Sequence, residues 1–238
     1  MSLINLIKPQ YSYLPYIIIS SIHSSLKFLK YENVSKFTKC FLIPLLALGF
    51  TIQNEYKISN ISHYIIFLLH WLGDILLLTS NFKIFLLGCL TFWIGDLIIA
   101  KNIFDMLPEN FYKNLAYSSI LFVSAYLYVI YGFMNKYLVK NKHREHAVIF
   151  GLPLLIMNIF ALTLSLCSSK IEDYILFIGT FSFIFSDFAI IQKNFVYSFS
   201  EKEDFIIIST YCLAEGLIFV RIGNPGFLSN ISFNNLIA

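Results

Sequence analysis

Four carboxylic acids lie inside long apolar stretches of the sequence, where a charged side chain is costly. They are Asp74, Asp96, Asp187 and Glu215. A carboxylate at the centre of a membrane helix costs about 3 kcal/mol even on the most lenient insertion scale. Such residues usually face the interior of a helix bundle and act on protons, ions or substrates. These four positions are therefore the first candidates for chemistry.

Two of these carboxyl groups share a helix face with a second polar side chain. His70 precedes Asp74 by four residues, and Tyr211 precedes Glu215 by four. In an α-helix this spacing places both side chains on one face. We therefore expect each pair to point in one direction, towards the interior of a bundle.

Asp74 and Asp187 are expected to share one depth in the membrane. Asp74 lies four residues before the end of its predicted span, and Asp187 lies five before the end of its own, which runs in the same direction. At 1.5 Å per residue these depths are about 6 and 7.5 Å. Lys39 and Tyr211 are expected at the same end of the bundle, and Asp96 near the opposite face.

A pair of carboxyl groups in a poorly hydrated site can supply both an acid and a base. Two such groups cannot both ionise cheaply when they are close, so one keeps its proton while the other is charged. We predict that Asp74 and Asp187 are the catalytic pair, without assigning the proton to either. The alternative is that both are hydrogen-bonding groups between helices, or caps for the backbone of broken helices.

No other motif indicates a metal, a cofactor or a further nucleophile. His143 and His146 lie in a basic loop with no further His or Cys nearby, so we interpret this loop as solvated. Gly73 and Asp74 match the end of the Gly-x-Gly-Asp signature of intramembrane aspartyl proteases, but Trp71 replaces its first glycine. Neither a Gly-x-Ser-x-Gly motif nor a Gly-rich phosphate loop occurs.

The composition places most of the chain in a membrane. Of its 238 residues, 58% are hydrophobic and 13% are charged, whereas a soluble domain carries about 25% charged residues. A net charge of +3, spread over short loops, does not indicate nucleic acid as a partner. We predict an all-α integral membrane bundle, with a single transmembrane domain over residues 1–238.

About eight apolar runs approach the roughly 20 residues that a membrane-spanning helix needs. Helices are expected because open strands leave backbone groups unsatisfied in lipid. The first run lacks the basic start and the small-residue cleavage site of a signal peptide, so we interpret it as the first span. The predicted spans are Tyr13–Phe28, Phe37–Thr51, Ser62–Leu78, Phe82–Ala100, Leu115–Met134, Val148–Cys167, Tyr174–Gln192 and Phe205–Ile222.

The positive charges predict how these spans are oriented. Eight alternating spans place 11 of the 17 Lys and Arg residues on one side and six on the other. Since cytoplasmic loops are enriched in Lys and Arg, the first side is predicted to be cytoplasmic. It includes the basic stretch from Lys136 to Arg144. Both termini are then on the other side.

Six short patterns occur in order along the sequence, from the second predicted span to the last. They are Thr38-Lys39-Cys40 with Pro44, Leu72–Leu77 around Gly73-Asp74, Gly88 with Phe92, Met157 with Ala161, Gly179 with Phe183, Ser186 and Asp187, and Tyr211–Glu215. In these patterns the chain resembles the lysoplasmalogenase (YhhN-like) family of eight-span membrane proteins. Three positions depart from it. Cys40 interrupts a Lys-Pro, Asp96 replaces a fourth-span histidine, and Glu215 replaces a last-span glutamine.

The resemblance implies that the vinyl ether bond of a lysoplasmalogen is hydrolysed, releasing a fatty aldehyde and a glycerophospho-ethanolamine or -choline. An acid protonates the outer alkene carbon, and a carboxylate stabilises the resulting oxocarbenium ion until base-activated water attacks it. This chemistry suits Asp74 and Asp187, and Lys39 can meet the phosphate at the interface. The expected substrate-binding residues are Lys39, His70, Tyr211 and Glu215. His70 can instead be a packed histidine bonded to a neighbouring helix.

Two alternatives from other classes use the same residues. In a small proton-coupled transporter, Asp74, Asp187 and Glu215 form a relay, although no internal repeat supports this reading. A catalytically silent lipid-binding or scaffold protein is the other. The expected partners are the membrane and a lysophospholipid within it, while the sequence leaves the oligomeric state open. The family suggests the endoplasmic reticulum in a eukaryote or the inner membrane in a bacterium.

Overall fold

The computed structural model describes residues 11–54, 60–79, 81–133, 144–168, 170–195 and 201–223. Within these ranges the chain forms eight α-helices and no β-strand. The helices are α1 (Leu14–Phe28), α2 (Glu32–Gln53), α3 (Ile61–Leu76), α4 (Phe82–Phe104), α5 (Tyr112–Phe133), α6 (Arg144–Ser168), α7 (Ile171–Phe195) and α8 (Glu201–Gly223). The predicted all-α bundle of eight helices is confirmed.

Six of the described helices, α2 and α4 to α8, are long and apolar enough to cross a membrane. The two remaining helices are shorter, since α1 has 15 residues and α3 has 16. At 1.5 Å per residue these two extend over roughly 22 to 24 Å, less than the 30 Å of a typical hydrocarbon core. The six long apolar helices identify a multi-pass integral membrane protein.

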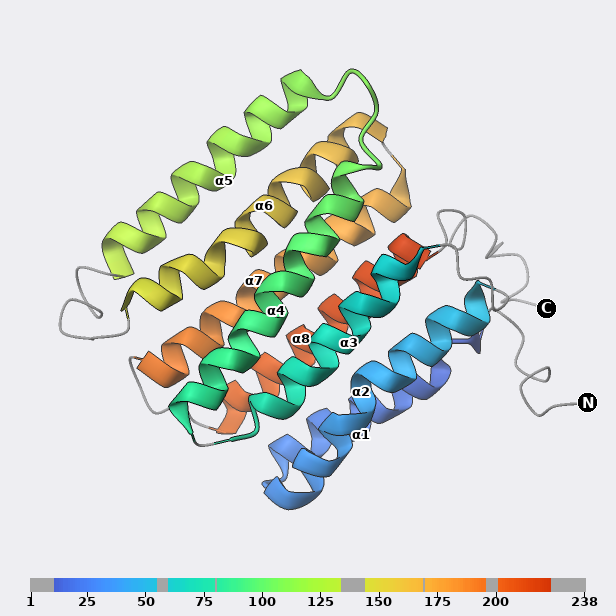
Figure 1. Ribbon diagram of the computed structural model, residues 1–238, viewed down its shortest axis with the longest axis vertical. Coiled ribbons are helices and arrows are strands. Elements are labelled where there is room, and N and C mark those ends of the chain that lie inside the picture. Colours follow the sequence, from blue (N-terminus) through green and yellow to red (C-terminus); the bar gives the residue numbers. More distant parts are fainter. Residues whose placement is uncertain are drawn as a thin grey trace, which may run out of the picture.

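Successive helices run in alternating directions (Figure 1). As a result α1, α3, α5 and α7 all finish at one end of the bundle, at Phe28, Leu76, Phe133 and Phe195. We call this the lysine-rich end, because the sequence assigns 11 Lys and Arg residues to it. Helices α5 and α6 form one edge of the bundle and α1 and α2 the other (Figure 1). Between them, α3 packs on α4, α7 packs on α8, and α6 contacts both α4 and α7.

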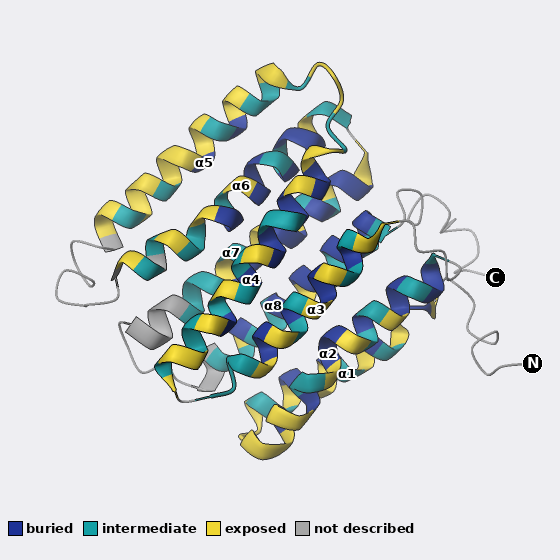
Figure 2. Cartoon of the chain, in the orientation of Figure 1, coloured by how far each residue is buried: buried dark blue, intermediate teal, exposed yellow. Residues whose placement is uncertain are grey.

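Large apolar side chains cover the outside of the bundle as well as its interior. Tyr128 on α5 is 79% exposed, and most of this helix faces outwards (Figure 2). In the interior the rings of Phe67 and Phe219 stack at 4.1 Å, and Phe50 packs edge-on against both. Because lipid tails are as apolar as leucine, an apolar exterior is stable only when lipid surrounds it.

Glycines bring α3 and α4 into close antiparallel contact. A Cβ atom added to Gly73 would lie 2.5 Å from the Phe92 ring, and one added to Gly88 would lie 3.1 Å from Leu76 Cβ. Small residues allow membrane helices to approach in this way. Since Gly88 lies opposite Leu76, the last residue of α3, the first turn and a half of α4 extends beyond the end of α3.

A buried ion pair joins α7 to α8 at the end opposite the lysine-rich end. Arg221 Nε donates to Asp173 Oδ1 at 2.6 Å, and the Ser168 hydroxyl donates to Asp173 Oδ2. Both charged side chains are almost fully enclosed. Because each charge compensates the other, the two helices are held in register at this end, several helical turns away from Asp187.

Candidate active site

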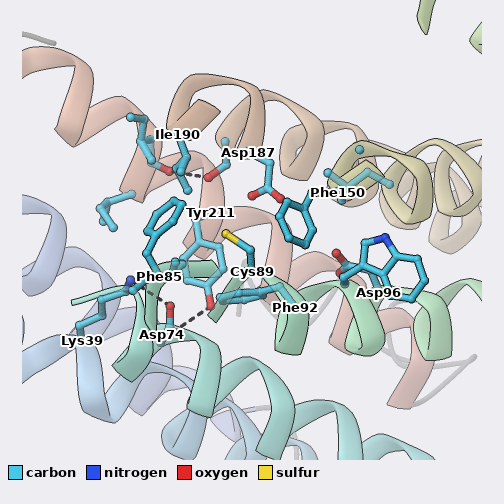
Figure 3. A pocket seen from close by; sticks show the side chains of 17 residues that line it. Lys39, Asp74, Phe85, Cys89, Phe92, Asp96, Phe150, Asp187, Ile190 and Tyr211 are labelled. Atoms are coloured by element: carbon cyan, nitrogen blue, oxygen red, sulfur yellow. Dashed lines mark hydrogen bonds and ion pairs between the residues drawn. The ribbon is translucent and has the colours of Figure 1, made fainter. Parts of the chain in front are cut away.

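A pocket between six helices lies in the half of the bundle nearest the lysine-rich end. Its cavity volume, counted for the centres of water-sized spheres, is about 80 Å³. Its walls are mainly aromatic and aliphatic, and the ionisable oxygen and nitrogen groups among its lining residues are Lys39, Asp74, Asp96, Asp187 and Tyr211 (Figure 3). A largely apolar pocket with a few convergent polar groups is the usual form of a small-molecule site.

Asp74 is held by partners from two other helices. Lys39 Nζ on α2 lies 3.1 Å from Asp74 Oδ1, and the Tyr211 hydroxyl on α8 donates to Asp74 Oδ2 at 2.9 Å. The Asp74 side chain is only 2% exposed, whereas that of Lys39 is 13% exposed. Hydrogen bonds of this charge-assisted kind favour the ionised carboxylate. Asp74 therefore has a cation and a hydroxyl donor that favour its ionised form within an apolar wall.

Asp187 lines the same pocket in a different setting. Its carboxyl group makes no hydrogen bond or ion pair with any residue that the structure describes. The preceding residue, Ser186, is turned towards α8, where its hydroxyl donates to the backbone oxygen of Ile207 at 3.2 Å. Asp74 and Asp187 therefore meet one pocket with opposite surroundings, one with a compensating cation and one without.

His70 connects two further carboxyl groups behind the pocket. Its Nδ1 lies 2.7 Å from Glu215 Oε1 on α8, and its Nε2 lies 3.5 Å from Asp96 Oδ1 on α4. The ring packs against Phe92 and Phe183, with centroid separations of 5.0 and 6.0 Å. All three ionisable side chains are at most 3% exposed. Of the three, only Asp96 lines the pocket.

The two polar pairs that share a helix face on α3 and α8 meet each other across the bundle. His70 contacts Glu215 and Asp74 contacts Tyr211, as expected for antiparallel helices. Each pair spans one helical turn, so both contacts form without a change in helix direction. Lys39, Asp74, Asp187 and Tyr211 come together in the pocket, as their spacing predicted. His70 and Glu215 lie behind it, outside its lining.

The expectation that Asp96 lies near the opposite face is wrong. Asp96 lines the pocket and lies opposite His70, one helical turn, or about 6 Å, deeper than Asp74. The physical reason is the offset between α3 and α4. Helix α4 extends further towards the lysine-rich end than α3 does. A residue far along α4 therefore still lies in the lysine-rich half of the bundle. Hydropathy does not report this offset.

Two of the three positions that depart from the family pattern contact one residue. Asp96 and Glu215 lie on either side of His70, although they are 119 positions apart in the sequence. The third departure, Cys40, lies next to Lys39, and its backbone oxygen accepts a hydrogen bond of 2.9 Å from Trp71 Nε1. The departures from the pattern therefore concentrate around His70 and the mouth of the pocket, and not in the outer helices.

The described residues contain no group of three or more His, Cys, Asp or Glu side chains arranged to hold a metal ion. His146 belongs to the first turn of α6, and His143, with the rest of the basic stretch before Arg144, lies outside the described residues. The ionisable side chains that line the pocket include carboxyl, ammonium and phenol groups.

A family model described as the YhhN family matches residues 34–222. The match begins near the start of α2 and ends one residue before the end of α8, so it includes every ionisable residue of the pocket. No curated protein and no solved structure matches the chain.

Proposed function

Because the chain belongs to the YhhN family, which includes lysoplasmalogenases, we propose that it hydrolyses the vinyl ether bond of a lysoplasmalogen within the membrane. The products are a fatty aldehyde and a glycerophospho-ethanolamine or -choline. The reaction needs a proton donor, a carboxylate and water in a site that a single-chain lipid can reach. The pocket supplies the two carboxyl groups, Asp74 and Asp187.

The observation that carries the proposal is the unequal setting of two carboxyl groups in one pocket. Asp74 has Lys39 and Tyr211 as partners, whereas Asp187 has neither a cation nor a hydrogen-bond donor among the described residues. Pairs of carboxyl groups with contrasting surroundings divide into an acid and a base. We assign the proton donor to Asp187 and the permanent carboxylate to Asp74.

The reaction then follows with all atoms and charges balanced. Asp187 transfers its proton to the outer alkene carbon, whose new C–H bond uses the π electrons of the double bond. The inner carbon becomes an oxocarbenium ion, which the Asp74 carboxylate stabilises. Water adds to this carbon and gives a proton to Asp187, which is now a carboxylate and can act as a base. The resulting hemiacetal collapses to aldehyde and alcohol.

The lining of the pocket accommodates the two ends of the substrate. Lys39 is more exposed than its partner Asp74, at 13% against 2%, and has three donors, of which Asp74 occupies one. The others can reach a lipid phosphate. Phe85, Phe150 and Ile190 provide apolar walls for the hydrocarbon next to the vinyl ether. The scissile bond would then lie between Asp74 and Asp187.

The test is aldehyde release by the purified protein from three lipids with the same headgroup and chain length. One carries the vinyl ether, one a saturated alkyl ether and one an ester. We expect fatty aldehyde from the vinyl ether and no cleavage of the alkyl ether, which has no double bond to protonate. Release of fatty acid from the ester would indicate an esterase instead. If no lipid is cleaved, the proposal is wrong.

The alternative of a small proton-coupled transporter needs a polar path to both ends of the bundle. On the described residues, the contacts from the pocket continue through Asp96 and His70 to Glu215. Glu215 Oε2 has no hydrogen-bond partner there that would extend the path. A polar network that opens towards one end only supports a reaction pocket more than a transport route.

A further inference from the structure

Three buried side chains form a second polar cluster at the inner end of the pocket, and no step of the proposed reaction up to the hemiacetal uses it. We call Asp96, His70 and Glu215 the relay. They come from α4, α3 and α8, and their side chains are 3%, 0% and 0% exposed. Ionisable groups so fully enclosed in a membrane protein require a role, because burying them without compensation is costly.

The geometry of the relay is that of a bridge. Each ring nitrogen of His70 faces a different carboxyl group, Glu215 at 2.7 Å through Nδ1 and Asp96 at 3.5 Å through Nε2. Imidazole can take up a proton on one nitrogen and release another from the opposite nitrogen. Since Asp96 lines the pocket and Glu215 does not, the bridge has one end open to the pocket and one end closed.

The relay has too few protein partners to be a satisfied structural network. Glu215 Oε2 has no hydrogen-bond partner among the described residues, and Asp96 Oδ1 and His70 Nε2 have only each other, at 3.5 Å and without hydrogen-bond geometry. Fully satisfied buried networks hold helices together, whereas partly satisfied ones are costly. Hydrogen-bonding atoms without a full set of partners on all three residues are expected where protons move between these residues.

The other charged and titratable groups around His70 cannot neutralise the relay. Asp74 is one turn away on α3 and is already paired with Lys39 of α2. Tyr211 of α8 donates to Asp74, and α7 contributes Asp187, a further carboxyl group. His70 is therefore the single positive charge available to Asp96 and Glu215 within the described residues, so at least one of these carboxyl groups must share a proton.

We propose that the relay stores a proton for the reaction pocket. Collapse of the hemiacetal requires one carboxyl group to give a proton to the departing glycerol oxygen while another takes the hydroxyl proton. Asp187 gives its proton to the departing glycerol oxygen, and Asp96 takes the proton of the hemiacetal hydroxyl group. His70 holds a proton on each nitrogen before this step, and once Asp96 is neutral the ring gives its Nδ1 proton to Glu215, which leaves all three groups uncharged. In the reverse transfer Glu215 returns its proton to His70 Nδ1 and Asp96 gives its proton to the ionised Asp187 in the same pocket, so that none is gained or lost over one turnover. This inference rests on the proposed function.

The relay can be tested without relying on activity, by infrared difference spectroscopy of the full-length protein in detergent across a pH series. Protonated carboxyl groups give separate carbonyl bands, which Asp96→Asn and Glu215→Gln assign. If a proton is shared, Asp96→Asn should move the pH midpoint of the Glu215 band by about one pH unit or more, the threshold for coupled titration. In a His70→Gln background the same substitution should no longer move it.

The same two carbonyl bands are measured in control variants, and they also give the result that would contradict the proposal. Asp105→Asn and Glu145→Gln change exposed carboxyl groups outside the pocket and should leave both bands unchanged. If Asp96→Asn leaves the Glu215 band where it was, the relay proposal is wrong, even if His70→Gln fails to fold. If the two bands are coupled but the protein releases no aldehyde, the proposed function is wrong and the relay proposal is supported. If the bands titrate independently in a protein that releases aldehyde, the relay proposal is wrong and the proposed function is supported.

Discussion

Lys39 and Asp74 form an ion pair of 3.1 Å across α2 and α3, at the border between the pocket and the lysine-rich end. The lysine is partly exposed and the aspartate is almost completely buried. This arrangement gives the ammonium access to the interface while the carboxylate stays inside the apolar wall. The pair therefore places a carboxyl group and its compensating cation in the wall of the pocket, and several consequences can be measured.

Removing the cation should destabilise the fold more than removing both charges. Lys39→Met leaves the Asp74 carboxylate buried and unpaired, a change that typically costs about 3–5 kcal/mol. The double variant Lys39→Met/Asp74→Asn should recover part of this loss, because no charge remains to be compensated. Thermal unfolding in detergent measures both. Lys101→Met, which breaks an exposed pair with Asp105, should cost about 1 kcal/mol or less.

Both pocket aspartates should be essential for turnover but not for folding. Asn keeps the shape and hydrogen bonding of Asp but cannot supply or accept the proton. Asp74→Asn and Asp187→Asn should each lower aldehyde release by roughly 100-fold or more, the usual scale for lost acid–base catalysis. Asp105→Asn is the control. Near wild-type rates in both pocket variants would show that the carboxyl groups only hold helices together.

The Tyr211 hydroxyl should contribute to turnover through Asp74. Tyr211→Phe removes a hydrogen bond to a charged group, worth about 1.5–3 kcal/mol, while the ring still packs against Phe92 and Phe183. We expect turnover to fall about tenfold or more, with little change in secondary structure by circular dichroism. Tyr126→Phe removes a hydroxyl that donates to the Val148 backbone outside the pocket, and it should leave turnover unchanged.

Gly95 should tolerate no side chain, because His70 occupies the space. A Cβ atom at Gly95 would overlap the His70 imidazole, whereas one at Gly132 would meet nothing within 4 Å. Gly95→Ala should therefore destabilise the protein by about 1–3 kcal/mol through overpacking. Gly132→Ala should be neutral or slightly stabilising, since alanine is the better helix former. Melting temperatures that fall equally in the two variants would contradict this account of the α3–α4 contact.

The lysine-rich end is predicted to face the cytoplasm, and the pocket with it. Position 142 lies outside the described residues, but the charge count assigns it to that side. In a background without the native cysteines, Lys142→Cys should react with an impermeant maleimide only when the cytoplasmic face is accessible. Labelling from the other face alone would reverse the orientation and leave the pocket chemistry untouched.

The helices themselves could be predicted from the sequence, because the length and polarity of an apolar run are local properties. The predicted span Phe82–Ala100 corresponds to α4, and Val148–Cys167 to α6, with ends that differ by a few residues. The four-residue spacing of His70 from Asp74 also placed both on one buried face. Burial of charged groups in lipid limits them to the interior, so the candidate residues followed from composition and helical periodicity alone.

The tertiary structure decided how those faces meet. Hydropathy describes each helix by itself and carries no information on the axial offset between neighbours. The close approach of Gly88 to Leu76 sets this offset between α3 and α4, and it is the reason why Asp96 lies in the pocket and not near the opposite face. Partners that lie far apart in sequence were likewise decided by packing. Lys39 and Tyr211 both contact Asp74, whereas Asp187 has no hydrogen-bond or ion-pair partner among the described residues. The contrast on which the proposed chemistry depends is a property of helices in contact, since an ion pair or hydrogen bond exists only at a distance that the fold determines.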